Sequence, residues 1–206
     1  MAVMDSTGML GIVASMVFIA RLTPQPLRLA RSGVADGVSP LSALNGLIAA
    51  VSWLVYGLLV DDPVVWIVSL VAVLPGVWTV ALLRRETTWR DLLTAGAWAG
   101  SVVTAALAGY LAAALAVGVL VTQGPQVWRA CRERDLSGLS PATWGLSILD
   151  AAAWGAYGVA ADDAAMIGYA VVLSSSAVVV LTRIRWTRSQ ARSDGAKRRT
   201  TSSAMT

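Results

Sequence analysis

The distribution of charged residues constrains this chain more than any other feature of its sequence. Between positions 92 and 128 no residue is charged, and between positions 37 and 83 only Asp61 and Asp62 are. A helix of about 20 apolar residues crosses the roughly 30 Å hydrocarbon core of a bilayer. These stretches therefore predict an integral membrane protein. The 14% share of charged residues, against about 25% in soluble domains, agrees with that prediction.

The composition also excludes several classes of protein. The chain has no histidine and a single cysteine, Cys131, so the sequence offers no His-based catalysis, no metal site built from His or Cys, and no internal disulfide. No nucleophile–base constellation stands out, and we expect neither an enzyme nor a cofactor. The net charge of +4 comes from basic residues that flank apolar segments, which is a topology signal, so no nucleic-acid partner is expected.

The apolar runs predict seven transmembrane helices, with approximate limits of 8–29, 41–60, 64–83, 92–107, 109–128, 142–161 and 164–181. Seven spans place every basic residue except Arg21 on one side of the membrane. Basic loops face the cytoplasm, so we expect the N-terminus outside and the C-terminus inside. The richness in Ala, Val, Gly and Arg hints at a bacterial genome and hence at the plasma membrane. The polar tail, residues 184–206, is expected to be disordered.

The chain contains an internal duplication. Shifting the sequence by 101 residues aligns 24–62 with 125–163, and 13 of these 39 positions are identical. Each repeat holds three spans, 8–83 and 109–183, and a linker helix within 84–108 restores the orientation of the second repeat. The predicted fold is an all-α membrane protein of two parallel three-helix bundles joined by a linker helix.

The matching motifs resemble those of a known family. Pro24–Gln25 and Pro125–Gln126 match the signature of PQ-loop proteins, and each is followed by Gly-x-Ser-Pro, Trp-x-x-Tyr-Gly and Asp-Asp. Together they resemble the SWEET sugar transporters over residues 8–183. The resemblance implies a central sugar cavity between the repeats, with Trp53 and Trp154 stacking on the solute.

The same resemblance implies further pocket positions. An Asn pair that binds the sugar in the family corresponds to Ser69 and Ala170, and neither is Asn here. Positions one helical turn before each Trp also line the family pocket, and they are Ala49 and Asp150. The residues Gly57 and Gly158, which follow the Trp positions, are expected to permit close helix packing.

The prolines of both repeats are candidate hinge or gate positions. Pro24 and Pro125 each remove a helix hydrogen bond. A hinge is favoured over a static kink because the break is expected at equivalent places in both repeats. The neighbouring amides of Gln25 and Gln126 can donate to or accept from the freed backbone.

Three polar side chains lie inside the predicted spans. Asp150 is in mid-span, where a charge is costly, so it is expected to be protonated, paired or facing a water-filled cavity. Arg21 could pair with Asp150 or snorkel towards the cytoplasmic headgroups, and snorkelling is slightly favoured because Leu22 takes the family's pocket-facing place. Asn45 could bind solute or tie its helix to a neighbour.

These features lead to three functional hypotheses. The leading one is a SWEET-like facilitator that moves a small polar solute, with a mono- or disaccharide favoured, by alternating access. The alternative is a proton-coupled PQ-loop exporter of an amino acid or cationic solute, which Asp150 and the missing Asn pair favour. The second alternative is a non-transporting receptor or assembly protein. The expected partners are the solute and membrane lipid, and a homo-oligomer is left open.

Overall fold

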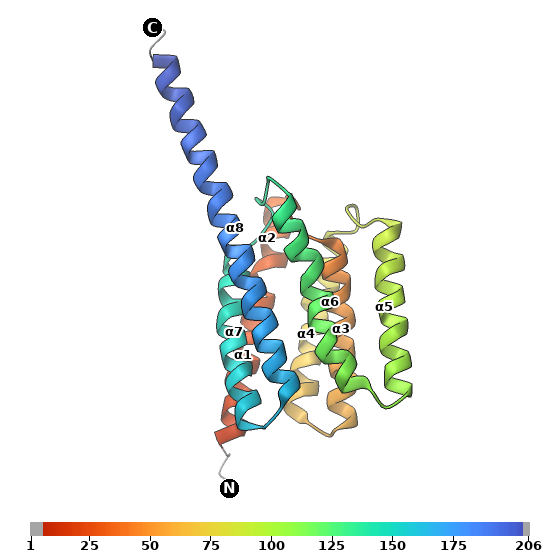
Figure 1. Cartoon of the computed structure of the whole chain (residues 1–206). Helices are drawn as coiled ribbons and strands as arrows, with labels where there is room; N and C mark the ends of the chain where they lie inside the picture. The colour runs from red at the N-terminus through yellow and green to blue at the C-terminus, as the bar shows by residue number, and fades with distance from the viewer. Residues whose placement is uncertain (1–5, 204–206) are drawn as a thin grey trace.

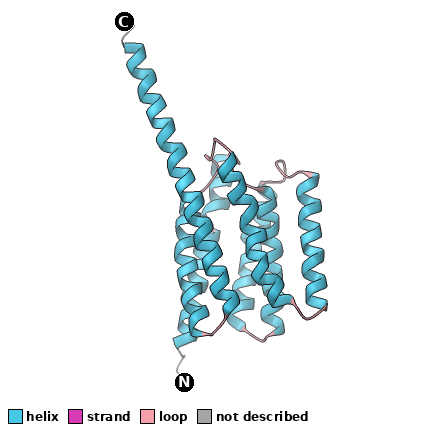
Figure 2. Ribbon diagram, in the orientation of Figure 1, coloured by secondary structure: helices cyan, strands magenta, loops and turns pink. Residues whose placement is uncertain are grey.

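The computed structural model describes residues 6–203, which form helices and short connections with no strand (Figure 2). The expected all-α membrane fold is confirmed. Five helical segments, one of them made of α1 and α2 together, are long and apolar enough to cross a bilayer. The helices are α1 (Ser6–Leu22), α2 (Pro24–Ser32), α3 (Pro40–Leu59), α4 (Pro63–Leu82), α5 (Trp89–Leu107), α6 (Leu111–Arg132), α7 (Pro141–Ala160) and α8 (Ala164–Ser203).

The helices form two three-helix bundles with the same pattern of contacts. In the first bundle α4 contacts both α1 and α3, and in the second α8 contacts both α6 and α7. The bundles meet through α1 against α7 and α3 against α6, while α5 lies outside them against α3 and α6 (Figure 1). This is the predicted arrangement of two parallel bundles and a linker helix. The residue limits given above for the two repeats remain predictions.

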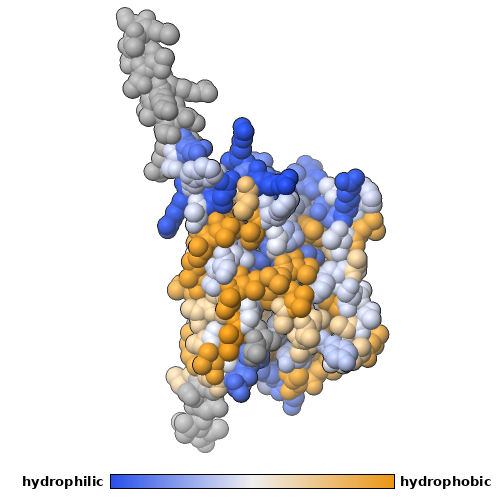
Figure 3. Space-filling view, viewed as in Figure 1, coloured by the Kyte–Doolittle hydropathy of each residue, from blue (hydrophilic) through white to orange (hydrophobic). Residues whose placement is uncertain are grey.

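The two ends of the bundle differ in charge. The connections 33–39, 83–88 and 133–140 lie at one end, which we call the basic end because arginines flank them. The turns at Asp61–Asp62 and Asp162–Asp163 lie at the other end, which we call the acidic end. An apolar band separates the two ends (Figure 3). This is the surface that a membrane-spanning protein presents to lipid.

The residue types of the Gly-x-Ser-Pro and Asp-Asp motifs are those that suit the start of a helix. In both Gly-x-Ser-Pro segments the serine hydroxyl caps the next helix, and the proline takes the first helical position, where no N–H is needed. In the first Asp-Asp pair Asp61 has a left-handed backbone with φ of 53°, and Asp62 caps α4. Asp162 has the same φ of 53°. Aspartate tolerates this conformation better than most residues.

Close helix packing at Gly57 and Gly158 is confirmed. A Cβ atom at Gly57 would lie 2.6 Å from the backbone nitrogen of Trp66, and one at Gly158 would lie 2.8 Å from the Cβ of Met166. Any side chain at either position would push apart the two helices that meet at the acidic end. The two glycines therefore keep α3 close to α4, and α7 close to α8.

Two features differ from the predictions. The chain breaks at Thr23, between α1 and α2, but α6 continues through Pro125, so the expectation of a break in both repeats is wrong for the second. In addition, α8 is helical to Ser203 and projects beyond the basic end, where the sequence predicted a disordered tail (Figure 1). Its last part has no proline and contains several good helix formers, which favours continuation of the helix.

Candidate functional site

A cavity of about 270 Å³ lies inside the bundle and is lined by residues from all eight helices. Along α3 its lining begins at Ala43 and ends at Trp53, and along α6 it extends to Gln123. Along α4 the lining runs from Val65 near the acidic end to Thr79 near the basic end, so the cavity extends along most of the length of the bundle.

The two predicted tryptophans both line this cavity. Trp53 comes from α3 and Trp154 from the equivalent turn of α7. Each indole packs edge-on against the tyrosine three residues later, Tyr56 or Tyr157, with ring centroids 5.5 Å apart in both pairs. The tyrosines hold the indoles in place, and the indoles offer flat apolar surface to any molecule in the cavity.

The other predicted pocket positions divide into two groups. Ser69 and Ala49 line the cavity. Ala170 does not line the cavity. Its methyl group faces α7 instead, 3.1 Å from where a Cβ atom at Gly155 would lie. Its neighbour Tyr169 takes the cavity-facing position. One residue along a helix turns the side chain by about 100°, which accounts for the difference.

Asn45 ties α3 to α6 and does not line the cavity. Its side-chain Nδ2 donates to the backbone oxygen of Val121 at 3.1 Å. Val121 lies four residues before Pro125, so its carbonyl is the one that loses its helical partner when residue 125 is proline. Asn45 supplies the missing donor. The residue equivalent to Asn45 in the second repeat is Leu146, whose side chain cannot donate a hydrogen bond. The helix of the first repeat therefore receives no such donor, and it breaks at Thr23.

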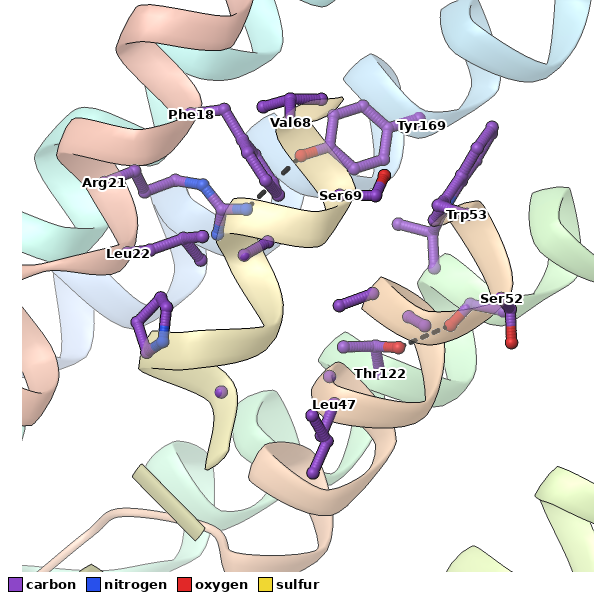
Figure 4. Close-up of a pocket in the computed structure, with 18 of the residues that line it drawn as sticks. Phe18, Arg21, Leu22, Leu47, Ser52, Trp53, Val68, Ser69, Thr122 and Tyr169 are labelled. Atoms are coloured by element: carbon purple, nitrogen blue, oxygen red, sulfur yellow. Dashed lines mark hydrogen bonds between the residues drawn. The ribbon is translucent and has the colours of Figure 1, made fainter. Parts of the chain in front are cut away.

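Asp150 is fully buried and belongs to a charged cluster. Its Oδ2 lies 3.0 Å from Nε of Arg21 and accepts a hydrogen bond from the Tyr169 hydroxyl at 2.6 Å. A terminal nitrogen of Arg21 in turn donates to the same hydroxyl at 3.4 Å (Figure 4). Asp150 is therefore paired, one of the three states that its position predicted.

Arg21 connects this cluster to the cavity. Its side chain is 13% exposed and lines the cavity, while that of Asp150 is 0% exposed and does not. The guanidinium also lies over the ring of Phe18, 4.9 Å from the centroid. The interpretation of Arg21 as a snorkelling residue is therefore wrong, because Asp150 and Tyr169 hold it inside the bundle.

The two PQ glutamines form crossed links between the repeats at the basic end. Each amide nitrogen donates to a glycine carbonyl of the other repeat's connection, and each amide oxygen accepts from the N–H of the capping serine there. The bonds join Gln25 to Gly138 at 3.1 Å and to Ser140 at 2.9 Å, and Gln126 to Gly37 at 2.7 Å and to Ser39 at 2.8 Å.

These contacts lie across the boundary between the repeats, and not on the freed backbone where the amides were expected. The two connections also touch directly, since the N–H of Gly138 donates to the Asp36 carbonyl at 3.0 Å. A Cβ at Gly138 would lie 2.6 Å from that same oxygen. The basic end is therefore fastened by reciprocal contacts between the repeats.

The sequence analysis did not identify Tyr169 as a cavity residue, and it did not predict the inward orientation of Arg21. Tyr169 stands 19 residues after Asp150 on the next span, but which side of the bundle it faces depends on the rotation of that helix about its axis.

Among the described residues no group of three or more His, Cys, Asp or Glu side chains could hold a metal ion. No protein-family model matches the chain, and no curated protein matches it.

Proposed function

We propose that the chain is a SWEET-like transporter that moves a small polar solute, with a sugar favoured, by facilitated alternating access. The observation that carries the proposal is the cavity inside a bundle of two parallel repeats, with an equivalent tryptophan from each repeat in its wall. Tryptophan faces stack well on the C–H faces of a sugar ring. A cavity between repeats is also where transporters of this kind bind solute.

The size of the cavity favours a monosaccharide. Its volume of about 270 Å³ is below the roughly 300–1,000 Å³ of sites that hold drug-sized ligands. A single pyranose ring suits this volume better than a disaccharide. The polar side chains in the wall, among them Ser69, Thr143 and Tyr169, supply a few hydrogen-bonding groups in a mostly apolar surface.

The proposed setting is the plasma membrane of a bacterium. The arginines of the basic end face the cytoplasm in this proposal, since basic connections are retained on that side. The N-terminus then lies outside and the C-terminus inside. Solute would reach the cavity from one side at a time, as contacts between the repeats break at one end of the bundle and form at the other.

Proton-coupled export of an amino acid or cationic solute is the second candidate, and Asp150 is the observation that favours it. The contacts of Asp150 argue for facilitation instead. Its carboxylate is fully buried and paired with Arg21, so it does not stand free in the cavity as a proton-carrying site would.

Flux into proteoliposomes tests both candidates. We expect the purified protein to equilibrate labelled monosaccharide across the membrane without accumulating it, at similar rates at two external pH values. Empty liposomes give the background. Uphill accumulation driven by a pH gradient would favour the exporter, and no flux with any sugar or amino acid would leave a non-transporting receptor on this fold.

A further inference from the structure

The charge in the cavity wall lies on one side only. Arg21 is the only Asp, Glu, Lys or Arg among the described lining residues, and its partners are Asp150 and Tyr169. The internal repeat places Thr122, Ala49 and Val68 at the positions equivalent to these three, and all three equivalents also line the cavity. The opposite wall thus presents no charge.

Only part of the charged cluster is in contact with the cavity. Arg21 lines the cavity, whereas the carboxylate of Asp150 lies behind it with no exposed surface. Figure 4 shows the Arg21 guanidinium and the Tyr169 hydroxyl directed towards each other at one wall. A molecule in the cavity would meet N–H donors of a guanidinium whose positive charge is balanced at 3.0 Å by Asp150.

We propose that Asp150 sets the charge selectivity of the cavity: by neutralising Arg21 it makes the site select uncharged polar solutes. Hydroxyl oxygens of such a solute accept hydrogen bonds from Arg21 while its carbon faces stack on the tryptophans. A charged solute would lose its hydration in an apolar cavity that holds no net counter-charge, which is costly. The choice of a sugar as the uncharged solute rests on the proposed function, but the charge balance does not.

The proposal predicts opposite changes for the two halves of the pair. Asp150→Asn keeps the shape of the side chain but leaves Arg21 as an uncompensated cation, so a carboxylate becomes the preferred ligand. Arg21→Gln leaves Asp150 uncompensated and favours a cation. The double variant Arg21→Gln/Asp150→Asn carries neither charge, so it returns to an uncharged preference and serves as the matched control.

A series of three pyranoses that differ in charge tests the selectivity directly. The probes are radiolabelled D-glucosamine, D-glucose and D-glucuronate, bound by the purified full chain in detergent. Wild type and the double variant should prefer glucose. Asp150→Asn should shift the ratio of glucuronate to glucose affinity upwards by roughly tenfold, the effect of one unit charge at close range in a partly hydrated site.

A second measurement does not depend on sugar binding. In a Cys131→Ser background, Ser69→Cys places a thiol in the cavity wall, where it can react with methanethiosulfonate reagents of charge +1, 0 and −1. The rate ratio of anionic to cationic reagent should rise roughly tenfold with Asp150→Asn, fall with Arg21→Gln, and return in the double variant. Gel filtration of each variant reports whether it remains folded.

The two measurements separate the proposals. Shifted reagent ratios without binding of any sugar would support the charge selectivity and reject a sugar as solute. Unchanged ratios in Asp150→Asn relative to the double variant would overturn the charge selectivity, even if sugar binds. Absence of reaction with all three reagents would show that solute cannot reach the cavity, which would overturn it as well. If Arg21→Gln fails to fold, the comparison of Asp150→Asn with the double variant still decides.

Discussion

At the scale of single residues, the indoles of Trp53 and Trp154 offer flat apolar surface to a solute from equivalent places in the two repeats. Replacing either by alanine should weaken sugar binding roughly tenfold, because stacking on an aromatic face is worth about 1 kcal/mol or more. Equilibrium binding of labelled glucose measures the change. Trp78→Ala is the matched control, since Trp78 is exposed on the apolar surface of α4 and does not line the cavity. Equal losses at all three positions would mean a general loss of stability.

At the scale of single helices, the continuity of α6 depends on a donor from α3. Asn45→Leu leaves the Val121 carbonyl without its partner, at an expected cost of about 1–3 kcal/mol in the free energy of unfolding. Pro125→Ala restores the helical N–H, so the same substitution should cost less in that background. Unfolding in mixed micelles of the four proteins gives the coupling energy. A coupling energy of zero would show that Asn45 does not compensate for Pro125.

The crossed glutamines make a second prediction at this scale. Gln126→Ala removes the acceptor of the Ser39 N–H in the other repeat, and Gln25→Ala removes that of Ser140. Each substitution should therefore speed hydrogen exchange mainly in the connection of the opposite repeat. Exchange followed by mass spectrometry resolves peptides that cover 33–39 and 133–140. Faster exchange confined to the substituted repeat would contradict the crossed arrangement.

At the scale of the whole molecule, the charge difference between the two ends predicts the orientation in the membrane. In a Cys131→Ser background, Asp61→Cys and Asp162→Cys should both react with an impermeant thiol reagent added to intact cells, and Arg84→Cys should react only after the cells are opened. Reaction of the two acidic turns from opposite sides would contradict the parallel arrangement of the repeats.

Much of this architecture could be predicted because it depends on local sequence. Charge-free runs gave the spans, and the repeated motifs marked the caps, the packing glycines and the paired tryptophans. Features that depend on helix rotation could not be predicted. Tyr169 faces the cavity and Ala170 does not, and Arg21 points at Asp150, because of how each helix turns about its axis. The continuity of α6 depends on Asn45, a residue 76 positions from Val121.

The buried charged cluster also shows that the two repeats have diverged in sequence since their duplication. Arg21 comes from the first repeat, Asp150 and Tyr169 come from the second, and none has a counterpart of like kind in the other. A homodimer of first repeats would bury two arginines with no carboxylate, and a homodimer of second repeats would bury two carboxylates with no arginine. The charged cluster can therefore form only where one first repeat meets one second repeat.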